Sequence, residues 1–270
     1  MQTSFGGKLI ALLLALLTGP AHLALGGEVA PGSATTPAAA SSSPAGLNLS
    51  SEDAPEAQSA PYDPFVPVNE KILNFNKYFD DHVSRPIAEA WARVLPYPVR
   101  RGLQRFFRNL GETSNAINCA LQQRYRDAGQ SAARFLINST LGFAGIFDVA
   151  DNWFGIKPHR TDFGLTLAHY GIDFGPYLMY PAAGPSTLRD AVCGAADGAA
   201  NPMSAMVYTL PFLVYTPVFI GLGIIYGINE RSFDLPLFED VDRYSVDLYG
   251  AVQDGYYQAR RNHQVPYTHY

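Results

Sequence analysis

Three residues of the sequence, Ser186, His169 and Asp190, have the side chains of a hydrolytic triad. In such a triad a histidine takes the proton of a serine hydroxyl, and an acid holds the histidine in place. These roles depend on geometry, and a chain of this length contains such a trio by chance. The sequence has no Gly-x-Ser-x-Gly elbow, no His-Glu-x-x-His helix and no Gly-x-x-x-x-Gly-Lys loop. We therefore expect no catalytic site, and an enzyme acting on lipids is the least favoured function.

Two histidines, His159 and His169, have the aspartates Asp162 and Asp173 near them in sequence. Nitrogen and carboxylate donors of this kind hold metal ions when their spacing brings them together. Here the spacing does not place two ligands on one face of a helix, and loop capping is the commoner role for such residues. We expect no metal and no cofactor.

A second group of ionisable residues lies within an otherwise apolar part of the chain. Its members are Asp162, Asp173, Arg189, Asp190 and Asp197. Ionisable groups at membrane depth usually face a water-filled path or a partner charge. The alternative is that Arg189 and Asp190 are ordinary loop charges.

The composition limits the class of protein that could position these residues. Only 16% of the 270 residues are charged, whereas about 25% is usual for a soluble domain. A surface that faces something other than water is therefore indicated. The formal net charge of -5 argues against nucleic acid as the main partner, because nucleic-acid-binding domains usually carry a basic excess.

The N-terminal sequence indicates export. Residues 1–26 have the order of a signal peptide, and we expect residues 27–60 to form a disordered Ala/Ser/Pro-rich linker and residues 263–270 to form a flexible tail. The folded helical domain is expected over residues 61–262. In an oxidising compartment Cys119 and Cys193 could pair, and burial as two free thiols is the alternative.

Apolar residues recur at helical spacing in several segments. The first helix runs from Val68 to Val83 and is expected to stop before Pro86, and a short helix follows between Pro86 and Pro96. Further helices are expected over Asp127 to Leu141 and after Asp247. Between these two, glycines alternate with aromatic residues, which indicates irregular pieces and a hairpin around Gly171 to Gly175.

One predicted helix is both amphipathic and basic. Its apolar stripe consists of Val99, Leu103, Phe106, Phe107 and Leu110. The arginines that fall off this stripe are the candidates for contact with lipid headgroups: Arg100, Arg101, Arg105 and Arg108. A surface helix whose apolar face covers a core gives the same pattern as a helix lying at a membrane interface, so both interpretations stay open.

The segment from Gly198 to Asn229 contains no charged residue. Its apolar part, Met206 to Ile228, is long enough for a transmembrane helix, but prolines and glycines interrupt it. We favour two shorter membrane-embedded helices over a straight span or a buried soluble core. The residues expected in this membrane-embedded wall are Met206, Leu210, Phe212, Phe219, Ile224 and Ile225.

Taken together, the motifs resemble those of the MlaA (VacJ-like) phospholipid-transport lipoproteins. The resemblance runs from about Tyr62 to Arg261. Its most specific part reads Asp162-Phe163-Gly164, Thr166-Leu167, Gly171, Gly175-Pro176-Tyr177, Pro181, Gly184-Pro185-Ser186 and Arg189-Asp190. Many matches in one order are stronger than any single short motif.

The resemblance implies an all-α fold, a ring of amphipathic and membrane-embedded helices around a central channel in the outer membrane. Such proteins lie beside trimeric porins and remove misplaced phospholipid from the outer leaflet. They pass it to a periplasmic carrier that feeds an inner-membrane ABC transporter. The candidate polar channel residues are then Asp162, Arg189, Asp190 and Asp197. A porin-associated structural protein without transport activity is the alternative.

The sequence departs from the family pattern at some positions. Family members usually carry a lipidated cysteine after the signal peptide, but the first cysteine here is Cys119. We expect either anchoring through the helices themselves or a wrongly chosen start codon. Gln123 replaces the glycine of a Leu-Gln-Gly turn.

Overall fold

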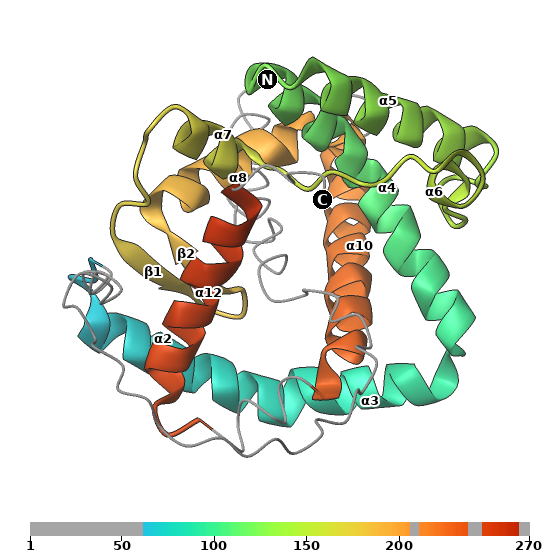
Figure 1. The fold of residues 1–270 in the computed structure, drawn as a ribbon. Helices are drawn as coiled ribbons and strands as arrows, with labels where there is room; N and C mark the ends of the chain where they lie inside the picture. Colours follow the sequence, from blue (N-terminus) through green and yellow to red (C-terminus); the bar gives the residue numbers. More distant parts are fainter. Residues whose placement is uncertain (1–61, 206–210, 237–244, 265–270) are drawn as a thin grey trace, which may run out of the picture.

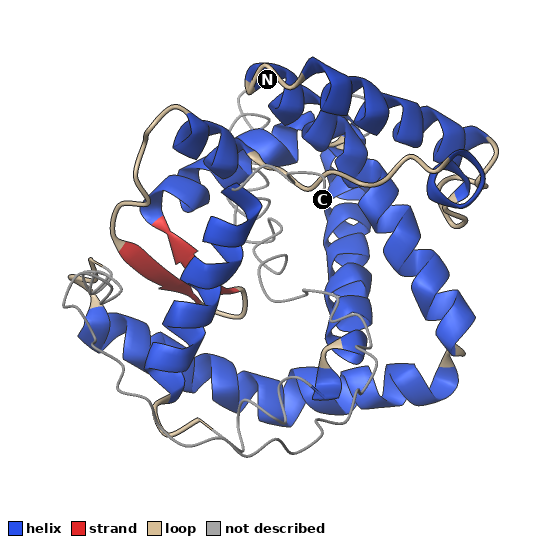
Figure 2. Ribbon diagram, in the orientation of Figure 1, coloured by secondary structure: helices blue, strands red, loops and turns tan. Residues whose placement is uncertain are grey.

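The computed structural model describes residues 62–205, 211–236 and 245–264. Most of these residues are helical, and the strands form one short hairpin (Figure 2). The all-α prediction with a hairpin segment is confirmed. The predicted signal peptide, linker and most of the tail lie outside the described residues, as do Met206 and Leu210.

The described helices are arranged as a ring with one helix through its middle (Figure 1). Helices α2 and α3 form the lower edge of the view, α4 forms the right side, and α5 with α6 forms the top. The left side consists of α7, α8, the hairpin and α12, while α10 runs down through the centre. The ring-like arrangement that the family resemblance implied is confirmed.

The lower edge is one continuous helical rod. It consists of α2 (Val66–Phe79), the π-helix η2 (Asp80–Ser84) and α3 (Arg85–Val94). The prediction that Pro86 ends the first helix is wrong. In the π-helical turn the Arg85 N–H donates to the Asp80 carbonyl, and this wider turn directly before Pro86 accommodates the proline in the first turn of α3.

Two asparagines on α2 hold the hairpin against the rod. The hairpin pairs β1 (Tyr177–Tyr180) antiparallel with β2 (Gly184–Thr187). Asn69 and Asn76 lie on one side of α2, being seven residues apart. Asn69 donates to the Tyr177 carbonyl (3.1 Å), and Asn76 donates to the Tyr180 carbonyl (2.8 Å). The predicted hairpin therefore exists but follows the Gly171 to Gly175 loop.

The right side and top of the ring are two packed helices. They are α4 (Tyr97–Leu121) and α5 (Tyr125–Thr140), followed by the short helix α6 (Val149–Phe154). Gln123 in the turn between them has a φ of 61°, the left-handed region that favours glycine. Gln123 thus replaces the glycine of the family pattern at a position where glycine would adopt the backbone conformation at a lower conformational energy.

The buried side of α4 is mostly polar. Buried positions include Gln104, Asn109, Glu112 and Asn118, whereas no residue of the predicted apolar stripe is buried and Val99 is 48% exposed. The other four residues of the stripe are half-buried, and Phe107 packs against Tyr226, so both interpretations of the stripe stay predictions. Elsewhere a small apolar core does form, where Tyr177 and Met179 of β1 pack on Tyr256 and Tyr257.

The central helix α10 spans Phe212–Phe233 without a break. The prediction that its prolines divide it is wrong for this part. Pro217 lies within the second turn, where it removes one of the first backbone hydrogen bonds of the helix and leaves the rest intact. Among the described helices, none combines the length and apolar content that crossing a membrane requires.

The remaining elements complete the left side of the ring. They are α7 (Phe163–His169), α8 (Leu188–Ala200), the 3-10 helix η3 (Pro202–Ala205) and α12 (Leu248–Gln264). The helix predicted after Asp247 is confirmed, and the Gly250 N–H donates to the Asp247 carboxylate at its start (3.1 Å).

Candidate functional site

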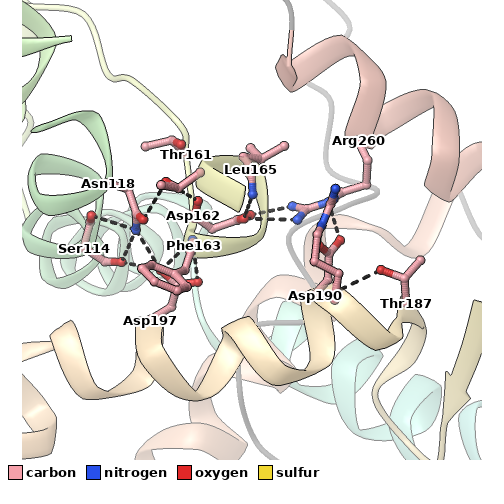
Figure 3. Close-up of polar contacts among 12 residues, drawn as sticks. Ser114, Asn118, Thr161, Asp162, Phe163, Leu165, Thr187, Asp190, Asp197 and Arg260 are labelled. Carbon is pink, nitrogen blue, oxygen red and sulfur yellow. Dashed lines mark hydrogen bonds and ion pairs between the residues drawn. The ribbon is translucent and has the colours of Figure 1, made fainter. Parts of the chain in front are cut away.

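A cluster of charged side chains joins α7, α8 and α12 (Figure 3). Asp162 precedes α7, and its carboxylate accepts from the Leu165 N–H (2.8 Å), which caps the helix. The same carboxylate receives both terminal nitrogens of Arg260, at 2.5 and 3.0 Å. This two-point ion pair attaches α12 to the start of α7.

Asp190 is the second carboxylate of the cluster. It lies 2.7 Å from the Arg260 Nε and accepts from the Arg189 Nε (2.9 Å) and the Tyr256 hydroxyl (2.5 Å). Burial pushes the pKa of Asp190 upward, but Arg260, the Tyr256 hydroxyl and Arg189 outweigh burial and hold that pKa below its ordinary value. Asp190 is therefore an anion shared by two arginines.

Gly164 makes this arrangement possible. A Cβ atom at this position would lie 2.3 Å from an Asp190 oxygen and 2.7 Å from an Arg260 nitrogen. Only a residue without a side chain lets α7 approach the ion pairs this closely.

Asp197 lies about two helical turns after Asp190 on the same side of α8, and its partners differ from those of Asp162 and Asp190. Its carboxylate accepts from Ser114 (2.7 Å), Asn118 (2.9 Å) and the Phe163 N–H (2.9 Å), all uncharged donors. Burial, and then the charge of Asp162, raise the pKa of Asp197 to about 6, although these three hydrogen bonds lower it. Asp197 is therefore mostly charged at neutral pH and becomes protonated in mild acid.

The structure brings the four predicted channel residues together, but partners within the protein satisfy most of their charge. Asp162 and Asp190 share Arg260, and Arg189 is buried against the Phe174 ring, 4.3 Å from its centre. The interpretation of Arg189 and Asp190 as loop charges is wrong, because both lie in the first turn of α8. Asp173, by contrast, is an exposed loop residue.

The described contacts do not assemble a triad from Ser186, His169 and Asp190. The Ser186 hydroxyl donates to the Thr187 carbonyl, His169 is exposed, and the Asp190 oxygens are engaged by arginines and a tyrosine. No group of three potential metal ligands occurs among the described residues.

Both cysteines are free and buried, as the free-thiol alternative predicted. Burial raises the pKa of Cys119 to about 11 and that of Cys193 to about 11. Both side chains are therefore neutral thiols at physiological pH and act as small apolar residues.

The arginines of the basic helix α4 have different environments. Arg100 donates to the Ser232 hydroxyl (3.0 Å) and the Leu95 carbonyl (3.2 Å), and its guanidinium stands 5.0 Å from the centre of the Phe233 ring. It is thus a packing residue between α4 and α10. Arg101, Arg105 and Arg108 remain half-buried along the same helix.

A buried ion-pair network that the sequence did not indicate joins α4, α5 and α6. Arg134 of α5 donates to Glu112 (2.8 Å), Asp148 (3.0 Å) and the Ile156 carbonyl (2.5 Å). Asn138 connects Asp148 to the Ala150 N–H. The available signal was that Glu112 is the one acid on an otherwise basic helix.

The polar end of α10 was also missed. Asn229 is fully buried, accepts from the Trp91 indole (3.2 Å) and donates to the Arg100 carbonyl (3.1 Å). Arg231 forms a two-point ion pair with Asp80 at 2.7 Å. These contacts attach the C-terminal end of α10 to η2, α3 and the start of α4.

Comparison with known proteins gives this arrangement a family. A family model described as MlaA lipoprotein matches residues 61–263. The chain belongs to the MlaA lipoprotein family. The resemblance found in the sequence is therefore confirmed, and the matched range agrees with the ring described above.

Several curated relatives and one solved structure support the MlaA assignment. A protein of Escherichia coli strain K12, named intermembrane phospholipid transport system lipoprotein MlaA, is 34% identical over 201 residues, covering 73% of this chain and 76% of that protein. An uncharacterized protein of Rickettsia felis is 35% identical over 200 residues, covering 74% and 76%. A solved structure from work on the maintenance of bacterial outer membrane lipid asymmetry has a TM-score of 0.65 and 30% identity, covering 75% of this chain and 99% of that one.

Proposed function

We propose that this protein transports phospholipid between membranes, removing misplaced phospholipid from the outer leaflet of the outer membrane. Membership of the MlaA family and the name of the E. coli relative support this proposal. The observation that carries it is the distribution of side chains. Polar residues such as Asn118, Arg189 and Asn229 are buried, while Val94, Phe143 and Trp153 are more than 70% exposed.

This distribution suits a ring that stands in lipid. Exposed apolar side chains are stabilised by acyl chains, and a polar interior offers hydrogen bonds to a headgroup that passes through. On α10 the predicted wall residues include Ile224, which is 56% exposed, and the half-buried Phe219 and Ile225. Transport of this kind makes and breaks no covalent bond, so the proposed activity is not enzymatic.

The proposal includes the location and partners that the family resemblance implies. The protein would stand in the outer membrane beside a trimeric porin. It would deliver phospholipid to a periplasmic carrier that feeds an inner-membrane ABC transporter. Asp162, Arg189, Asp190 and Asp197 would shape the polar path, with Arg260 holding Asp162 and Asp190 in place.

Deleting the gene in its own bacterium tests the proposal. We expect more phospholipid in the outer leaflet, measured by labelling whole cells with an amine-reactive reagent that does not cross the membrane. We also expect greater sensitivity to detergent in the presence of EDTA. The unmodified gene should restore both. Unchanged leaflet composition would remove the proposal.

A point variant separates transport from a structural role beside a porin, which the exposed Phe143 and Trp153 would also suit. We expect Asp190→Asn to give a partial transport defect, because it removes the anion that two arginines share. Asp173→Asn in the exposed loop is the matched control. If Asp190→Asn accumulates normally and fully restores the leaflet, the structural role is favoured.

A further inference from the structure

The charged cluster between α7, α8 and α12 contains one carboxylate that has no cation beside it. Asp162 and Asp190 are both paired with Arg260, and Asp190 is also paired with Arg189. No ion pair of the described residues includes Asp197. The cluster therefore consists of three carboxylates and two guanidinium groups, and one negative charge, that of Asp197, is left without a counter-charge.

The two oxygens of the Asp197 carboxylate are used unequally. Oδ1 accepts from the Ser114 hydroxyl (2.7 Å), the Asn118 amide (2.9 Å) and the Phe163 N–H (3.1 Å). Among the described residues, Oδ2 accepts from the Phe163 N–H alone (2.9 Å). A carboxylate oxygen can accept two hydrogen bonds, so Oδ2 keeps a position for one further donor.

A buried hydrogen-bonded chain fixes the neutral donors of Asp197. The side-chain oxygen of Asn118 accepts from the Thr166 hydroxyl (2.8 Å), and Thr166 accepts from the Gln122 amide (2.9 Å). All three residues are buried. Because its oxygen is already used, the Asn118 amide presents its nitrogen to Asp197. The carboxylate is thus held beside α4, and it lies apart from Arg260 (Figure 3).

The surroundings of Asp197 limit the ligand that its charge can attract. Asp197 is half-buried, so water screens its charge only in part. A carboxylate in such a position attracts cations and repels anions. A metal ion needs several protein ligands, and the described part of the chain offers no group of three. An ammonium group needs a single charged acceptor and can donate its other hydrogens to water, so it suits the open position on Oδ2.

We propose that Asp197 is a specificity-determining residue that accepts a hydrogen bond from the ammonium group of an ethanolamine headgroup. The proposal rests on the proposed transport function, and it names the class of phospholipid that the polar path favours. A headgroup that carries both a phosphate and an ammonium group brings the missing positive charge to the cluster. A headgroup that carries only a phosphate adds a second unbalanced negative charge and is disfavoured.

Direct binding tests this preference. The full chain is purified in an uncharged maltoside detergent at pH 8, where Asp197 is ionised. It is titrated separately with dihexanoyl phosphatidylethanolamine and dihexanoyl phosphatidylglycerol, and binding is followed by phosphorus NMR. We expect the wild type to bind the ethanolamine lipid about tenfold more tightly, the effect of one charge-assisted hydrogen bond.

Asp197→Asn supplies a test that misfolding cannot imitate, because the two lipids should respond differently. This variant keeps the shape of the side chain but removes its charge. We expect the ethanolamine lipid to bind about tenfold more weakly, while the glycerol lipid binds at least as tightly as before. Asp173→Asn, in the exposed loop before β1, removes a negative charge outside the cluster and is the matched control. It should keep the wild-type preference.

Three results would overturn the proposal. The first is equal affinity of the wild type for the two lipids at low salt, which needs no variant to be folded. The second is a wild-type preference that does not shrink as salt is raised, since an interaction between charges is screened. The third is an Asp197→Asn protein that weakens the binding of both lipids alike.

The remaining outcomes separate the possible ligands and the two proposals. If free ethanolamine, followed by proton NMR, binds as tightly as the short-chain lipid, the site is for free amines and its assignment to a headgroup is wrong. If the gene deletion leaves the outer leaflet unchanged while Asp197→Asn abolishes the preference, transport fails and the site stands. If the deletion disturbs the leaflet but Asp197→Asn keeps the preference, only the site is wrong.

Discussion

Two arginines, Arg134 and Arg260, each join two carboxylates, but they connect very different parts of the chain. Arg134 is paired with Glu112, 22 residues away, and with Asp148, so its network stabilises α4, α5 and α6 as one continuous segment. Arg260 is paired with Asp162, 98 residues away, and with Asp190, so it attaches the last helix to the left side of the ring. The first network holds a local unit together, and the second closes the ring.

The burial of the two arginines differs in the same sense. The Arg134 side chain is 5% exposed, against 13% for Arg260. Removing Arg134 should therefore leave the carboxylate of Glu112, which is 6% exposed, with little access to water, whereas the Arg260 partner Asp162 is 33% exposed and can be solvated. The comparison predicts a global loss of stability when Arg134 is removed and a local loss when Arg260 is removed.

The largest effect is expected for Arg134→Met. Loss of the cation leaves the buried Glu112 and the half-buried Asp148 without a partner charge, which costs about 3–5 kcal/mol of unfolding free energy. Urea unfolding of the detergent-solubilised protein measures this cost. Arg126→Met, on an exposed face of the same helix, should change it by less than about 0.5 kcal/mol.

Arg260→Met should cost less, about 2–3 kcal/mol, because its partners keep other donors and partial access to water. Hydrogen exchange should increase mainly in α12 and at the start of α7. Faster exchange spread evenly over α4 and α5 would contradict the division into a local unit and a closing contact.

Gly164→Ala tests the closing contact from the other side. The added methyl group would lie 2.3 Å from an Asp190 oxygen, and relieving such an overlap costs about 1–3 kcal/mol. Gly129→Ala in α5 is the matched control, since a methyl group there meets no other atom within 4 Å and should be neutral or slightly stabilising. Equal melting temperatures for the two variants would argue against close packing at Gly164.

Asp197, beside the closing contact, gives the ring a pH dependence. Its pKa of about 6 in the folded protein exceeds the ordinary value of 3.8, so the folded state binds more protons than the unfolded chain between these values. This contribution to stability is complete below pH ~4 and is lost as the pH rises through about 6. It amounts to about 1–2 kcal/mol after screening by solvent.

The difference in unfolding free energy between the wild type and Asp197→Asn isolates this group, because the other carboxylates titrate in both proteins. We expect the stability of the wild type, relative to the variant, to fall between pH 4 and 7. A difference that stays constant over this range would mean that Asp197 has an ordinary pKa.

The smallest effect is expected for Gln123→Gly, in the turn of the local unit. The left-handed conformation of Gln123 costs a non-glycine residue about 1 kcal/mol, which the added flexibility of glycine in the unfolded chain partly offsets. The variant should gain up to about 0.5 kcal/mol in urea unfolding. A loss of stability would mean that the Gln123 side chain makes a stabilising contact.

Much of the secondary structure was predictable because it depends on local patterns. The spacing of apolar residues predicts helices α2, α3, α5 and α12. The charged residues around Asp162 are recognisable because the surrounding sequence contains few other charges. Their partners were not predictable. Nothing in the sequence around Arg260 indicates that it pairs with a carboxylate 98 residues earlier. The same holds for the pairing of Asn69 with β1.

The misplaced helix boundaries have a common physical cause. Proline rules describe the cost of a lost hydrogen bond, and the chain avoids that cost at Pro86 with a wider turn and limits it at Pro217 by placing the residue near a helix start. Such solutions depend on contacts elsewhere, for example the ion pair between Arg231 and Asp80.

The π-helical turn at Asp80–Ser84 also sets the rotation of α3 relative to α2 about the axis of the rod. Each α-helical residue rotates the chain by about 100°, so the extra residue held in a π turn redirects every side chain that follows it. Asn76 thereby points to the hairpin, while Trp91 points to α10. Shortening this turn by one residue would rotate Trp91 away from Asn229 without altering the composition of either helix. The number of residues between Asn76 and Trp91 therefore decides that α2 contacts the hairpin and α3 contacts α10.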